Sequence, residues 1–337
     1  MLPAGQKMLK YQPCGKPRLL VVINDRLSDK KRNMKKMKFI VTTMALCTLI
    51  AHHSYAQGCS DAGFCTINSF KPNSNDSKKN LKNQFKAGAF FGNADYSISA
   101  YGTYLEYNRQ LNEKFAIDAK LTTLAQNGNG ISTFGLSDIF VNTSYKASEK
   151  VKFTLGVKLP LSQANKTSNN LPLPMDYQPG LGTVDLIFGM GYEMNKIQFV
   201  AAIQQPLTQN DNRFMATQYP VNSKLRTFQS TNKFVRSGDV LLRVSYPVNI
   251  TPKLKFTPGI LPIYHLANDK YTDEFNVQKE ITGSQGITLN GNAYLDYEIN
   301  SKSIIQLNMG IPFIVRDSRP DGLTRSFIAS LEYRIKF

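Results

Sequence analysis

The sequence contains no tryptophan, little charge and, after its first 56 residues, no long apolar run. Charged residues make up 19% of the 337 residues. No apolar run of the later chain approaches the roughly 20 residues that a transmembrane helix needs. That excludes a helical membrane protein, whereas a membrane-spanning β-strand needs only about half that length and alternating apolar positions. Length alone does not separate two ordinary domains from one large barrel.

Aromatic residues are plentiful despite the missing tryptophan. The chain has 20 Phe and 16 Tyr, which bring the aromatic share to 11%. Gly, Asn and Ser recur at short intervals between apolar segments. This composition is typical of a chain that forms many short strands.

The amino terminus has the features of a Sec signal peptide. A basic stretch at positions 35–38 precedes an apolar run over 39–51, and small residues precede position 57. We therefore assign residues 1–56 to a leader. Residues 1–33 are polar and basic, so we expect translation to start at Met34 or Met37. An uncleaved anchor is the alternative, although the apolar run is short for a membrane span.

Removal of the leader lowers the net charge. The first 56 residues hold 11 of the 41 Lys and Arg and 2 of the 24 Asp and Glu, so the formal charge falls from +17 to +8. The remaining excess is spread along the chain without a basic run. We therefore expect no nucleic-acid partner.

Two of the four cysteines lie in the leader, which leaves Cys59 and Cys65 in the segment GCSDAGFC. In an exported protein this pair predicts a small disulfide-closed loop. The alternatives are a redox or metal pair and lipidation of Cys59. Two thiols without a nearby histidine make a poor metal site, and Ala56 is weak for a lipidation signal.

From Phe85 onward, alternating segments are separated by short and long polar gaps in strict succession. The short gaps lie at 111–113, 147–149, around 195, 249–252 and 300–301, and the long ones at 126–132, 162–179, 208–233, 268–284 and 317–322. This succession predicts an all-β fold, a transmembrane antiparallel up-and-down β-barrel over residues 84–337 with short periplasmic turns and long external loops. We expect about 12 strands, within a range of 10–14. Their predicted positions are 84–92, 98–110, 114–125, 134–146, 150–161, 180–194, 196–207, 234–248, 253–266, 285–299, 302–315 and 323–337.

Four of these segments start with a lysine at the short gap and end with a proline about ten residues later. They cover 150–160, 196–206, 253–262 and 302–312. Ten residues span the apolar band in a tilted strand. Proline is tolerated at strand ends or bulges, so we expect these prolines near the outer rim.

The carboxyl-terminal segment RSFIASLEYRIKF alternates apolar and polar residues and ends at Phe337. A terminal phenylalanine on such a strand resembles the signal that the barrel-assembly machinery recognises. We therefore expect that machinery as a partner, together with the lipid bilayer and lipopolysaccharide. An even strand count places both chain ends in the periplasm.

An aspartate is followed seven residues later by a tyrosine three times along the chain. Because seven is odd, the two side chains of each pair face opposite sides of a strand. The tyrosines then belong to a periplasmic aromatic girdle and the aspartates to the lumen. The pairs are Asp138 and Tyr145, Asp185 and Tyr192, and Asp239 and Tyr246.

The candidate lumenal residues carry both signs of charge, as Lys152, Lys158 and Arg243 join the three aspartates. One interpretation is a tier of carboxylates that binds cations or repels anions. The other is a wall network, in which carboxylates pair with Lys or Arg on adjacent strands and hold the barrel's shape. Further residues expected to face the lumen are Glu106, Asp118, Lys120, Asp296, Glu298, Glu332 and Arg334.

Several segments carry a resemblance to a known family. The segments from Gly135 to Tyr145 and from Gly182 to Tyr192, with KFTLGVKLPLS over 152–162, resemble the outer-membrane transporters of the phenol-degradation meta-pathway type. That group is related to the long-chain fatty-acid and aromatic-hydrocarbon channels. The resemblance implies passive uptake of small hydrophobic or aromatic solutes across the outer membrane of a Gram-negative bacterium.

The sequence also bears on two other functions. A structural or interaction barrel, such as an adhesin or secretion-system component, is favoured by the long external loops. An enzyme is disfavoured, because His265 is the one histidine after the leader and neither a G-x-S-x-G nor an HExxH motif is present. We expect His265 to be an interface residue among aromatics, with no catalytic residue, metal or cofactor. The polar segment 57–83 either plugs the lumen or lies in the periplasm.

Overall fold

The computed structural model describes residues 66–72, 81–321 and 326–337. The chain divides into two compact units, residues 1–52 and 53–337, and all described residues belong to the second. The predicted leader, Cys59 and Cys65 lie outside the described residues. Among the described helices, none is both long and apolar enough to cross a membrane.

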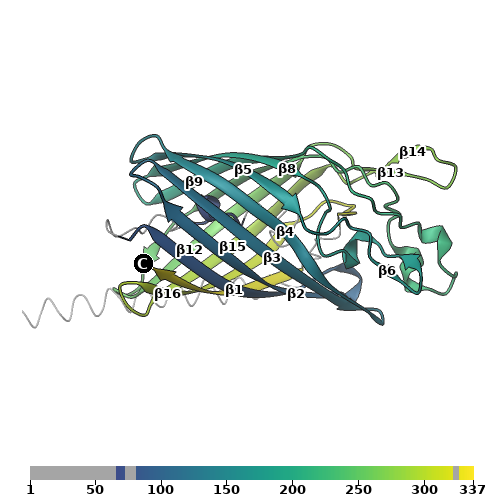
Figure 1. The fold of residues 1–337 in the computed structure, drawn as a ribbon, viewed down its shortest axis with the longest axis horizontal. Coiled ribbons are helices and arrows are strands. Elements are labelled where there is room, and N and C mark those ends of the chain that lie inside the picture. Colours follow the sequence, from purple (N-terminus) through teal and green to yellow (C-terminus); the bar gives the residue numbers. More distant parts are fainter. Residues whose placement is uncertain (1–65, 73–80, 322–325) are drawn as a thin grey trace, which may run out of the picture. The chain divides into compact units, whose positions relative to one another are not determined.

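Twelve antiparallel strands form a closed barrel (Figure 1). Each strand pairs with its neighbours in chain order, and the first strand pairs with the last over ten residues, which closes the sheet. The predicted up-and-down barrel of twelve strands is confirmed. The strands are β1 (Asn83–Asn93), β2 (Ser99–Gln110), β3 (Phe115–Gly128), β4 (Ile131–Lys146), β5 (Val151–Pro160), β8 (Asp185–Met194), β9 (Ile197–Pro206), β10 (Asp239–Ser245), β12 (Leu254–His265), β15 (Gly286–Glu298), β16 (Ser303–Ile314) and β17 (Phe327–Lys336).

The alternation in the sequence becomes two faces of the wall. Along β8 the residues Asp185, Ile187 and Gly189 are buried inside, whereas Leu186 and Phe188 are exposed outside. The same alternation leaves an apolar outer band on the other strands. A closed barrel with such a band presents it to lipid, because all backbone groups of the wall are paired between strands.

Short and long connections lie at opposite ends of the barrel. Both β1 and β17 have their free ends at the short-connection end, where the backbone of Asn83 pairs with that of Phe337. The prediction of a long connection over residues 126–132 is wrong. There β3 and β4 continue to a two-residue turn at Asn129 and Gly130, whose φ angles of 53° and 76° suit an Asn-Gly hairpin turn.

The prolines of the four lysine-to-proline segments occupy two kinds of position. Pro160 and Pro206 are the last residues of β5 and β9, as predicted. Pro262 and Pro312 lie inside β12 and β16 instead. The ladder between β10 and β12 is interrupted opposite Pro262, and the β15–β16 register shifts beside Pro312. A proline without an N–H is accommodated at such irregularities.

The long connections build a cap over the outer end. Its short elements are η3 (Asp95–Ser97), β6 (Thr167–Ser168), β7 (Leu171–Pro172), η4 (Met175–Tyr177), η5 (Ala216–Gln218), η6 (Lys224–Thr227), β13 (Lys270–Thr272) and β14 (Gln278–Glu280). An apolar cluster that includes Leu173, Tyr177, Phe214 and Phe228 holds three of these connections together. At the other end, β11 (Val248–Asn249) prolongs the pairing with β12. Inside the barrel lies η2 (Asn68–Phe70).

Candidate functional site

The lumen contains an outer polar tier near the external end of the strands. Lys158 of β5 forms an ion pair with Asp185 of β8, with Nζ and Oδ2 2.8 Å apart. Gln204 of β9 donates to the same carboxylate. Asp138 of β4 stands level with the end of β5, and its carboxylate accepts a hydrogen bond from Ser137 Oγ at 2.9 Å. Carboxylate, ammonium and amide therefore alternate around this part of the wall.

The third aspartate of the motif, Asp239, sits in a buried cluster on the same tier. It forms an ion pair with Arg236, and its Oδ1 lies 2.7 Å from Nδ1 of His265. The other ring nitrogen of His265 lies 2.8 Å from Oδ1 of Asp269. Each of the three motif aspartates thus contacts at least one polar group of its surroundings, and two of them contact a basic side chain.

His265 is not an interface residue, so that prediction is wrong. Its side chain faces inward at the end of β12 and is 1% exposed. Residue type alone gave no sign of this, because the decisive partners, Asp239 and Asp269, become neighbours only when β10 pairs with β12. Both ring nitrogens contact carboxylates, so neither is free to serve as the general base of a nucleophilic serine.

An inner polar tier lies closer to the short turns. Lys86 of β1 pairs with Glu106 of β2 at 2.6 Å, and both side chains are fully buried. Glu332 of β17 accepts a hydrogen bond from the Tyr104 hydroxyl at 2.7 Å and pairs with Arg334 at 2.8 Å. Buried charges of this kind are stable only when paired and hydrogen-bonded.

The remaining predicted lumenal residues are distributed over this inner part of the wall. Asp118 accepts a hydrogen bond from Asn142 at 2.7 Å, and Asp296 accepts one from Gln306 at 2.6 Å. The Lys120 ammonium lies 4.6 Å from the centre of the Tyr104 ring. Two further predicted residues, Lys152 of β5 and Glu298 of β15, are partly buried.

Between the two polar tiers, inward-facing side chains are apolar. They come from β4, β8, β9, β10 and β12, where each lies two residues from an outer-tier position, and they belong to one buried apolar cluster. These residues are Phe140, Ile187, Ala202, Leu241 and Ile263. This layer was not among the sequence-based predictions, although strand parity from the three aspartates places Phe140, Ile187 and Leu241 on the inner face.

Residues 66–72 lie inside the barrel and cover this apolar layer. Ile67 and Phe70 belong to the same apolar cluster and are each 1% exposed. The Phe70 ring packs against Gly189 of β8, where an added Cβ would lie 2.5 Å from ring atoms. Glycine at this position therefore leaves the flat surface on which the ring rests.

Polar contacts fix the same segment to the inner tier. Lys71 Nζ lies 2.9 Å from Glu332 Oε2, and Lys86 Nζ donates to Asn68 Oδ1 at 2.5 Å. Arg243, one of the predicted lumenal residues, donates to the Phe70 carbonyl. The described part of the polar segment 57–83 thus includes a stretch that occupies the lumen.

The three tyrosines of the Asp-Tyr motif lie on the outer face near the short turns. Tyr145 and Tyr192 are 36% and 38% exposed, and Tyr246 is 47% exposed. Tyr145 contacts Phe115, with ring centres 4.9 Å apart. Phe337 is also exposed at this end.

No His, Cys, Asp or Glu cluster among the described residues has the composition of a metal site. No protein-family model matches the chain. No curated protein matches it either.

Solved structures of similar fold are numerous. An outer membrane channel from Pseudomonas putida F1 superposes with a TM-score of 0.56 at 10% identity, over 79% of this chain and 99% of that one. A monoaromatic hydrocarbon channel, CymD, gives a TM-score of 0.43 at 8% identity, over 85% and 95% of the two chains. At such identities the likeness to the Pseudomonas channel shows the fold alone, and the weaker match adds nothing to it.

Proposed function

We propose that the protein is an outer-membrane channel of a Gram-negative bacterium for the passive uptake of small hydrophobic or aromatic solutes. The observation that carries the proposal is the Phe70 ring on Gly189 inside an apolar layer of the lumen. That layer offers an aromatic solute the same contacts that Phe70 now makes. The apolar outer band supports a location in a lipid bilayer.

The lumen is occupied by residues 66–72, so passage requires this segment to move. Its contacts are of two kinds, apolar around Ile67 and Phe70 and polar at Lys71. A twelve-stranded wall encloses more space than the inward side chains of an eight-stranded barrel fill. Displacement of the segment would therefore leave a conduit lined by the apolar layer between two polar tiers.

The test is solute flux through purified protein in liposomes. We expect a small aromatic probe to enter faster than in protein-free vesicles, and a zwitterionic solute of similar size to enter more slowly than the probe. A control uses a chain without residues 66–72. A barrel that passes no tested solute, with or without that segment, would instead favour a structural or interaction role.

A further inference from the structure

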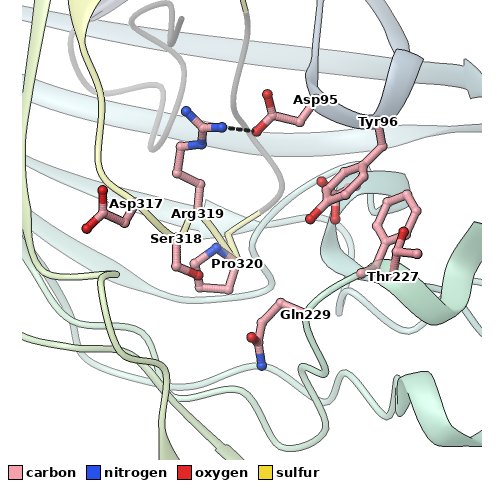
Figure 2. A pocket seen from close by; sticks show the side chains of 10 residues that line it. Asp95, Tyr96, Thr227, Gln229, Asp317, Ser318, Arg319 and Pro320 are labelled. Atoms are coloured by element: carbon pink, nitrogen blue, oxygen red, sulfur yellow. Dashed lines mark ion pairs between the residues drawn. The ribbon is translucent and has the colours of Figure 1, made fainter. Parts of the chain in front are cut away.

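A cavity lies among the external connections, outside the barrel strands (Figure 2). Its volume is about 200 Å³, below the roughly 300–1,000 Å³ of pockets for drug-sized ligands. Four connections that are distant in sequence contribute its wall, through Asp95 and Tyr96, Asp176, Phe228, and the stretch 317–320. A cavity of this size accepts a molecule with about one ring.

One wall of the cavity is aromatic. The Tyr96 and Phe228 rings stack with centres 4.0 Å apart and planes 27° from parallel. Tyr96 remains 45% exposed, so part of its ring is accessible. Its backbone has a φ of 55°, in the left-handed region, and Asn129 Nδ2 donates to its carbonyl at 3.0 Å. The ring is thus held in place before any ligand arrives.

The charges around the cavity are predominantly negative. Asp95 pairs with Arg319 at 2.6 Å, as the dashed line in Figure 2 marks. Asp176 and Asp317 also line the cavity, and no described basic side chain forms an ion pair with either of them. Three carboxylates and one guanidinium therefore line the cavity, which leaves a local surplus of negative charge.

Asp176 lines the cavity without a basic ion-pair partner among the described residues. Burial, together with the negative charges of Asp95 and Asp321, raises the pKa of Asp176 to about 7, against the opposing effects of a backbone hydrogen bond and of Arg319. A cation beside Asp176 would offset both causes by supplying the missing charge.

We propose that this cavity binds a small organic cation, an ammonium group joined to one flat apolar ring. The ammonium lies against Asp176, and the ring lies against the Tyr96–Phe228 wall, where aromatic faces favour both cations and flat apolar groups. The inference goes beyond the proposed channel function, because binding at the outer face is measured without any passage of solute.

Equilibrium titration of the purified full-length protein in detergent tests the proposal, with 2-phenylethylamine as the cationic probe and 2-phenylethanol as its neutral counterpart. At about pH 8 we expect saturable binding of the amine, about 10-fold or more tighter than that of the alcohol, as for a hydrogen bond to a charged group. Equal affinities, or no saturable binding of the amine, would overturn the proposal.

Two variants separate the site from a general attraction of cations. Asp176→Asn should weaken amine binding by about 10-fold. Asp211→Asn, which changes an exposed aspartate of the connection between β9 and β10, should leave the affinity unchanged. A loss of similar size in both variants, or in neither, contradicts the assignment. Phe228→Leu should weaken binding of the amine and of the alcohol alike. Folding of each variant is checked by its resistance to unfolding in cold detergent.

Discussion

Lys71 and Glu332 are separated by 261 positions in the sequence, yet their side chains form a buried ion pair of 2.9 Å inside the barrel. The pair fastens the lumenal segment to the last strand. When Lys71 is removed, Glu332 still has Arg334 and Tyr104 as partners. Loss of Lys71 therefore removes one attachment of the segment without leaving the carboxylate alone.

We expect Lys71→Ala to raise the flux of an aromatic probe several-fold in liposomes. Breaking a buried ion pair costs about 3–5 kcal/mol when the remaining charge has no partner. Because Glu332 keeps Arg334 and Tyr104, the occluded state loses less than that. Lys146→Ala is the matched control, because Lys146 pairs with Glu149 on the exposed turn after β4. Flux that is equal in wild type and Lys71→Ala would show that this pair does not hold the lumen closed.

Phe70→Ala should also open the lumen, by a different route. Truncation of a buried phenylalanine costs about 3–5 kcal/mol, and the vacated space over Gly189 matches an aromatic ring. We expect faster entry of an aromatic probe than of an aliphatic one of similar volume. An identical gain for both probes would argue against an aromatic subsite.

His265→Ala should lower the thermal stability of the barrel. The imidazole contacts Asp239 and Asp269, and its removal leaves two buried carboxylates with fewer partners, at a cost of about 3–5 kcal/mol. His265→Gln, which keeps hydrogen-bonding atoms, should lose less. Lost esterase or protease activity in the alanine variant would instead identify a catalytic histidine.

The cap should become less stable as pH rises toward neutrality. Burial raises the pKa of Asp176 from its ordinary value of 3.8 to about 7, so the folded chain holds a proton that the unfolded chain has lost between these values. Its contribution favours folding below about pH 4 and is lost as pH rises through about 7. The thermal unfolding temperature, measured from about pH 5 to pH 8, should fall more steeply with pH in wild type than in Asp176→Asn. Asp211→Asn should keep the wild-type slope.

The disulfide between Cys59 and Cys65 stays a prediction, since both residues lie outside the described part of the chain. Thiol labelling of the exported protein should modify neither cysteine before reduction and both after it. Labelling without reductant would support free thiols, and a lipid mass on Cys59 would support the alternative.

The sequence was sufficient to predict the strands of the barrel wall, but it was insufficient to predict which side chains meet inside the lumen. Strand parity predicts that Asp185 and Leu186 face opposite sides, because the period of a strand is two and the band it crosses has a fixed height. Partners across the lumen follow no such period. The place of His265 depends on the pairing of β10 with β12, and that of Phe70 depends on a glycine of β8 more than a hundred residues away.

The turn at Asn129 and Gly130 shows the same limit on a smaller scale. Its polar surroundings match an external loop in composition, and the Asn-Gly pair that makes a two-residue hairpin was hidden among other Asn and Gly residues. The extension of β3 and β4 places Asn129 beside Tyr96, whose carbonyl it binds.

The link from Lys71 to Glu332 also sets an order of events during biogenesis. The segment that fills the lumen is synthesised first, but its carboxylate partner belongs to the strand synthesised last. The segment can acquire this attachment only when β17 has joined β1 and the wall is complete. A chain stalled before closure would therefore lack this attachment, although its contacts with the earlier strands could already form.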